Sequence, residues 1–96
     1  MMLVALACAA CGAPPPQRCE AFAAALCERT AACDDDVDEG ACVERVETLL
    51  RCADVVAVTG DDGACLVDLD AFACEELAAG RVPPSCDRVD YRAAQS

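Results

Sequence analysis

The sequence predicts an all-α fold: a small three-helix domain stapled by disulfides. Two observations lead to this prediction. Ten of the 96 residues are cysteines, and a cysteine fraction above roughly 8–10% in a short chain is typical of a disulfide scaffold. Apolar residues recur at helical spacing in three stretches, whereas the alternation of a strand is not seen outside residues 54–61. Such scaffolds persist in oxidising surroundings, so an exported protein is expected.

The N-terminal segment predicts export. Residues 1–10 are uncharged and apolar, and about ten such residues fit a signal peptide but are too few to span a bilayer, which needs about twenty. The run Ala9-Ala10-Cys11-Gly12 is similar to the lipobox of bacterial lipoproteins, although Cys8 stands where that motif usually has leucine. We therefore expect Cys11 to be lipidated, with the Pro-rich residues 11–17 serving as a tether to the membrane.

Cysteine parity fits this cleavage site. Loss of residues 1–10 and acylation of Cys11 leave eight cysteines, an even number that can pair completely. Cleavage after Ala13 by an ordinary signal peptidase also leaves eight. A freely secreted protein is therefore the alternative to a lipoprotein.

Three helices are expected in the exported domain, residues 18–96. The first, 18–33, places Cys19, Phe22, Leu26 and Cys27 on one stripe. The second, 39–53, follows Asp38 as its N-cap candidate. The third, 62–79, ends near Gly80 as a C-cap. Residues 54–61, between the second and third helices, are interpreted as a loop.

Disulfides are expected to supply much of the stability, because six Leu, nine Val and two Phe make a thin core for this domain. In an up-down-up arrangement, cysteines at similar heights along the bundle are expected to pair. The preferred set is Cys19–Cys65, Cys27–Cys52, Cys33–Cys42 and Cys74–Cys86. An alternative set contains Cys42–Cys74 and Cys52–Cys65.

Charge and composition exclude several functions. The net charge of −11 disfavours binding to nucleic acid or to anionic lipid. The chain has no histidine, which removes the Ser-His-Asp and Cys-His catalytic arrangements. We expect no enzyme activity, no cofactor and no catalytic residues. The expected partners are the membrane, through the N-terminal lipid, and a basic protein; the chain is expected to be a monomer.

An acidic run offers a weak calcium candidate. Asp34, Asp36 and Asp38 have the spacing of the first three ligands in an EF-hand loop. Glu39 then replaces the required glycine, and Arg45 replaces the bidentate glutamate. A solvated loop between helices is therefore preferred over a metal site.

The arrangement of cysteines and apolar residues resembles a known group of proteins. The pattern comprises Cys19-x2-Phe22, Leu26-Cys27, Cys33, Cys42, Leu49-Leu50-x-Cys52, Ala64-Cys65-Leu66-x2-Leu69, Cys74 and Pro84-Ser85-Cys86. It is similar to small Ala-rich, cysteine-rich predicted lipoproteins of the myxobacterial kind. The resemblance covers nearly the whole exported domain and implies no catalytic residues.

The sequence thus predicts an exported, disulfide-stabilised cell-envelope protein, lipid-anchored at the outer membrane or cell surface, with a structural or protein-interaction role. Two alternatives remain open at this point. One is a freely secreted effector or inhibitor of the small disulfide-rich type. The other is a calcium-stabilised binding module.

Overall fold

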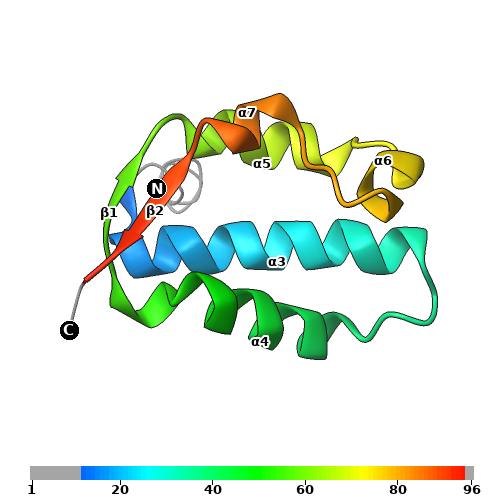
Figure 1. Ribbon diagram of the computed structural model, residues 1–96, viewed down its shortest axis with the longest axis horizontal. Helices are drawn as coiled ribbons and strands as arrows, with labels where there is room; N and C mark the ends of the chain where they lie inside the picture. Colours follow the sequence, from blue (N-terminus) through cyan, green and yellow to red (C-terminus); the bar gives the residue numbers. More distant parts are fainter. Residues whose placement is uncertain (1–11, 95–96) are drawn as a thin grey trace, which may run out of the picture.

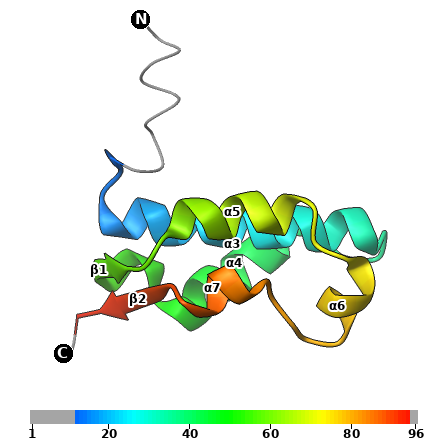
Figure 2. The same ribbon diagram turned by 90° about the horizontal axis from the view of Figure 1, so that it is seen from above.

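The structure is a computed structural model that describes residues 12–94. Its central element is the long helix α3 (Pro15–Cys33). Helix α4 (Glu39–Leu50) returns antiparallel along one side of α3, and α5 (Asp62–Asp70) and α7 (Pro84–Asp87) lie along another side (Figure 1). Helix α6 (Cys74–Ala78) lies beside the C-terminal end of α3 in both views (Figures 1 and 2). The predicted all-α, disulfide-stapled class is confirmed.

Helix α3 begins at Pro15 rather than at Arg18. Pro15 and Pro16 occupy its first positions, where a missing N–H is harmless because first-turn N–H groups lack an acceptor within the helix. The backbone N–H of Arg18 then donates to the carbonyl of Pro14 at 3.1 Å. The predicted tether therefore gives way to helix from residue 15 onward.

A two-stranded sheet replaces the loop expected at residues 54–61. Helix α4 ends at Leu50 because Arg51 adopts a left-handed conformation with φ 55°, and the short 3-10 turn η1 (Cys52–Asp54) follows. Strand β1 (Val55–Thr59) then pairs antiparallel with β2 (Asp90–Ala93). The β-branched residues of β1 favour a strand, but its partner lies near the opposite end of the chain, where local spacing gives no sign of it.

The third predicted helix is broken into α5 and α6. Between them Ala71 leaves the helical region, with φ −119° and ψ 15°. The carbonyl of Phe72 accepts a hydrogen bond from Arg29 Nε at 2.8 Å instead of one from its own helix. The C-terminal end agrees better with the prediction: Gly80, at φ 82°, closes α6, where Gly80 N–H donates to Leu77 and Arg81 N–H to Glu76.

Four disulfides join the described elements, and none of the predicted pairs is among them. The bonds are Cys19–Cys52, Cys27–Cys42, Cys33–Cys74 and Cys65–Cys86. The predicted Cys19–Cys65, Cys27–Cys52, Cys33–Cys42 and Cys74–Cys86 are wrong, as are the alternatives Cys42–Cys74 and Cys52–Cys65. All eight cysteines within residues 12–94, the ones predicted to pair, are nevertheless paired.

The error has a geometric cause. In an antiparallel pair of helices, residues equally far in sequence from the turn lie side by side, because both helices rise about 1.5 Å per residue. Cys19 and Cys52 are nearly equidistant from the turn at residues 34–38 and are joined. Cys42 is offset to the same extent from Cys27 and from Cys33, so spacing does not decide between them, and the structure joins Cys42 to Cys27. Cys33, at the end of α3, is then left for Cys74. The prediction also relied on an unbroken third helix, which the structure does not have.

The core is built around these bonds. One cluster contains Cys19, Cys52 and Val55, with Leu50, Val58 and Tyr91 packed against it. A second contains Cys65, Leu69 and Cys86, with Phe22, Ala25, Leu26, Val82 and Val89 around it. Each cluster thus has a disulfide at its centre. The fold buries sulfur where a larger domain would bury aliphatic side chains.

Candidate functional site

The candidate site lies at the end of the molecule where α3 finishes, far from the sheet (Figures 1 and 2). Three segments meet there: the last turn of α3, the acidic turn at residues 34–38 and the short helix α6. The Cys33–Cys74 disulfide joins the last turn of α3 to α6, with a Cα–Cα distance of 5.5 Å. We call this region the distal end.

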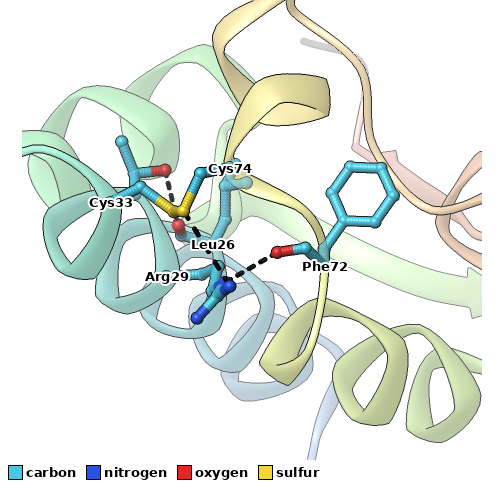
Figure 3. Close-up of a disulfide and its surroundings, with 6 residues drawn as sticks. Leu26, Arg29, Cys33, Phe72 and Cys74 are labelled. Atoms are coloured by element: carbon cyan, nitrogen blue, oxygen red, sulfur yellow. Dashed lines mark hydrogen bonds between the residues drawn. A yellow bond between two sulfur atoms is a disulfide. The ribbon is translucent and has the colours of Figure 1, made fainter.

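An arginine holds the backbone next to this disulfide. Arg29 lies one turn before Cys33 on α3, and its guanidinium points between α6 and the break that precedes it (Figure 3). Nε donates to the carbonyl of Phe72 at 2.8 Å, and Nη2 lies 3.9 Å from Cys74 Sγ. A positive charge therefore stands beside a sulfur that is at the surface.

A groove of about 320 Å³ opens beside the same disulfide. Its lining includes the apolar Leu77 and Ala78, the two half-cystines and the acidic Asp34 and Glu75. Thr30 also lines it, but the hydroxyl of Thr30 donates to the carbonyl of Leu26 at 2.7 Å and is already satisfied. The lining therefore combines apolar and acidic side chains.

The acidic turn does not gather a set of metal ligands. Asp34 Oδ1 accepts the backbone N–H of Asp36 at 3.0 Å, as in an ordinary turn, and Asp38 occupies the N-cap position of α4. Within residues 12–94, no group of three His, Cys, Asp or Glu side chains could hold a metal ion. Asp34, Asp36 and Asp38 form no such group; Asp36 and Asp38 line a second groove of about 400 Å³, and Asp34 lines the first.

Two ionisable groups with shifted pKa values lie at the other end of α3. Arg18 binds both carboxylate oxygens of Asp62, at 2.7 and 2.9 Å, and these hydrogen bonds lower the pKa of Asp62 despite its burial. Tyr91 stacks at a tilt on Phe22, with 5.7 Å between the ring centroids. Burial, reinforced by the nearby Asp62 carboxylate, raises the pKa of Tyr91 to about 12. These contacts join α3, α5 and β2, which indicates a structural role.

The sequence located some of this site and missed the rest. Cys33, Cys74 and the acidic turn were singled out, although with the wrong disulfide partners. Arg29 was missed because its acceptor is a backbone carbonyl, which any residue supplies. The Arg18–Asp62 pair was missed because its members are far apart in sequence. The predicted lipidation site, Cys11, and the signal peptide at 1–10 lie outside the described residues.

Fold and site together define a small, disulfide-stapled helical domain with an acidic, grooved distal end. Four disulfides in a domain of this size indicate an oxidising, extracellular environment. None of the helices within residues 12–94 is both long enough and apolar enough to cross a membrane. No protein-family model, no curated protein and no solved structure matches the chain.

Proposed function

We propose that this protein is an exported cell-envelope lipoprotein, anchored through Cys11, that binds a basic partner protein at its distal end. The observation that carries the proposal is the position of the groove. It lies at the C-terminal end of α3, whereas the residues that follow Cys11 lead into the N-terminal end of the same helix. A helix of 19 residues is about 28 Å long at about 1.5 Å per residue. The anchor and the groove would then lie at opposite ends of the domain.

Charge supports a basic partner. The chain carries 18 acidic and 7 basic residues, and Asp34 and Glu75 line the groove itself. Such a field speeds encounter with a cationic surface and repels anionic ones. Leu77 and Ala78 add apolar contact that charge alone does not provide. The partner segment we propose is extended and cationic, with at least one aliphatic side chain.

The role we propose is binding rather than catalysis. The two groups with shifted pKa values, Asp62 and Tyr91, lie at the opposite end of α3 from the groove. Each is engaged in packing: Asp62 in its pair with Arg18, and Tyr91 against Phe22. The groove is lined instead by a satisfied threonine, two half-cystines, small apolar side chains and two carboxylates.

Anchoring is tested by intact mass, with and without reduction, on the full chain produced in an exporting bacterial host. We expect a chain that begins at Cys11 and carries a lipid mass, recovered with the membranes, with eight thiols appearing only after reduction and alkylation. Cys11→Ser should abolish the lipid and release the protein from the membranes. A lipid-free chain that begins after Ala13 would support the freely secreted alternative instead.

Binding is tested with a fluorescent peptide of alternating lysine and leucine, and with a glutamate and leucine peptide as its counterpart. The cationic peptide should bind, and more weakly as salt is added. Ala78→Arg places a cation and a large side chain in the groove and should weaken binding about tenfold or more. Ala24→Arg, at an exposed position on α3 outside the groove, is the control with the same change in charge. Equal losses in both variants would mean that the overall charge attracts the peptide and the groove does not bind it.

A further inference from the structure

We infer that the Cys33–Cys74 disulfide is a thiol–disulfide exchange site, opened by an external dithiol while the other three bonds stay closed. Exposure distinguishes it. Among the four bonds in residues 12–94, Cys33–Cys74 alone contains no buried half-cystine: Cys33 is half-buried and Cys74 is exposed. The other three bonds contain Cys19, Cys27 and Cys65, each 0% exposed. Exchange requires a thiolate to reach a sulfur, so access alone favours this bond.

The groove supplies the approach. Both Cys33 and Cys74 line the 320 Å³ groove, as do the apolar residues Leu77 and Ala78. A small thiol can therefore reach the bond without unfolding the core. The other candidate for attack, Cys42, also lines a groove, but its partner Cys27 is fully buried between helices. Its release would leave an uncompensated thiolate in the core, which is unfavourable.

Arg29 makes Cys74 the better leaving group. Its Nη2 lies 3.9 Å from Cys74 Sγ, and its Nε bond to the Phe72 carbonyl fixes the guanidinium there (Figure 3). A neighbouring cation stabilises a thiolate, and a more stable thiolate leaves faster. The carboxylates of Asp34 and Glu75, which line the same groove, would destabilise a thiolate. The guanidinium is the group in hydrogen-bonding contact with the sulfur, so its effect should dominate.

The exchange balances as a two-electron reaction. One thiolate of the external dithiol attacks Cys33 Sγ; a new S–S bond forms, the Cys33–Cys74 bond breaks, and its electron pair leaves on Cys74 Sγ beside Arg29. The second thiolate of the dithiol then attacks the first sulfur of the dithiol, which is bonded to Cys33 in the mixed disulfide. This attack displaces the Cys33 thiolate. The dithiol is oxidised to a cyclic disulfide, and the protein gains two thiols, protonated with the two protons that the dithiol lost.

Opening the bond would act on the groove. No residue between Ala71 and Val82 is buried, and α6 has only five residues. The disulfide to Cys33 and the Arg29 bond to Phe72 are the links described above between this segment and α3. Reduction would remove the covalent link between α6 and α3. Leu77 and Ala78, which line the groove, would then become more mobile together with α6. The redox state of this bond would thus set the shape of the groove.

Limited reduction of the oxidised protein tests the inference directly. Dithiothreitol is added in small excess, samples are trapped with N-ethylmaleimide over time, and the labelled cysteines are mapped by mass spectrometry. We expect Cys33 and Cys74 to be labelled first, at least about tenfold faster than any other pair, with the far-UV circular dichroism nearly unchanged. With glutathione, the first mixed disulfide should form on Cys33. Equal rates for all four bonds, or first labelling of another pair, would overturn the inference.

A second measurement isolates the role of Arg29. In Cys33→Ser, Cys74 carries a free thiol whose pKa can be read from the pH dependence of its alkylation by iodoacetamide. We expect a pKa below the ordinary value of about 8.5, and a return towards that value when Arg29→Gln is added. Arg45→Gln, which removes an exposed arginine on α4, is the matched control and should not change it. A Cys74 thiol pKa that is the same with and without Arg29→Gln would refute the assignment of Cys74 as the leaving group.

Discussion

At the scale of single residues, the contact between Arg18 and Asp62 links the start of α3 to α5. Two hydrogen bonds at 2.7 and 2.9 Å join side chains that are 21% and 8% exposed. Asp62→Asn removes the carboxylate charge that faces the half-buried Arg18 guanidinium. We expect the free energy of unfolding to fall by about 1–3 kcal/mol, measured by urea denaturation. Glu76→Gln, in the exposed pair with Arg81, should change it by less than about 0.5 kcal/mol.

The same pair predicts how stability depends on acid. The pKa of Asp62 is lowered in the folded state, so the unfolded chain binds a proton at a higher pH than the folded one. The contribution of Asp62 is therefore complete above its ordinary pKa of 3.8 and is lost as the pH falls through the lower folded value. In Asp62→Asn this part of the acid-dependent loss should disappear. An unchanged acid profile would show that other carboxylates control it.

Tyr91 allows a prediction of how stability depends on alkaline pH. Its pKa rises to about 12 in the fold, so the unfolded chain loses its proton first, and stability should decline as the pH passes from about 10 towards 12. Because Tyr91 is the sole tyrosine, tyrosinate absorbance reports on this group alone. Its hydroxyl is buried and has no hydrogen-bond partner among residues 12–94. Tyr91→Phe should therefore leave stability at neutral pH unchanged or raise it by up to about 1 kcal/mol, and remove the alkaline decline. A loss of stability at neutral pH would indicate a partner for the hydroxyl.

At the scale of elements, the turn after β1 depends on a glycine. Gly60 has φ +95°, and a Cβ there would lie 2.4 Å from the carbonyl oxygen of Arg88, which is backbone and cannot move aside cheaply. Gly80 has a similar φ of +82°, but nothing lies within 4 Å of its Cβ position. Gly80→Ala should cost about 1 kcal/mol from conformation alone, and Gly60→Ala at least about twice that. Thermal unfolding of the two variants measures the difference. Equal losses would mean that the turn shifts freely away from Arg88.

The same elements show what local sequence can and cannot reveal. The helical stripes of α3 and α4 come from neighbouring residues and were predicted. Strand β1 was not, because a strand is stabilised by its partner, and β2 (Asp90–Ala93) is short and has no distinctive pattern of its own. The break between α5 and α6 was missed for a similar reason: the contact of Arg29 with the Phe72 carbonyl is made across the fold. The pairing of Cys19 with Cys52 was within reach, because their nearly equal distance from the turn can be read from the sequence.

At the scale of the whole molecule, stability rests on covalent links more than on apolar burial. Eight hydrophobic residues are buried within residues 12–94, and five of them are half-cystines; the other three are Ala23, Val55 and Leu69. The disulfides close loops of between 15 and 41 residues, and each such loop is worth about 3–4 kcal/mol in the chain-entropy account. The net stability of a small domain is only about 5–15 kcal/mol. The four bonds together therefore match or exceed it.

We therefore expect complete reduction to unfold the protein in the absence of denaturant. The helical far-UV circular dichroism signal should collapse once all eight cysteines are reduced and alkylated, because both core clusters lose the sulfur bridge at their centre. Protein carried through the same alkylation without reductant is the control and should keep its signal. Opening of Cys33–Cys74 alone should also keep most of it, since that bond lies outside both clusters. A helical signal that survives complete reduction would mean that Leu69, Val55 and their neighbours suffice to hold the helices together, and that the disulfides protect the fold rather than make it.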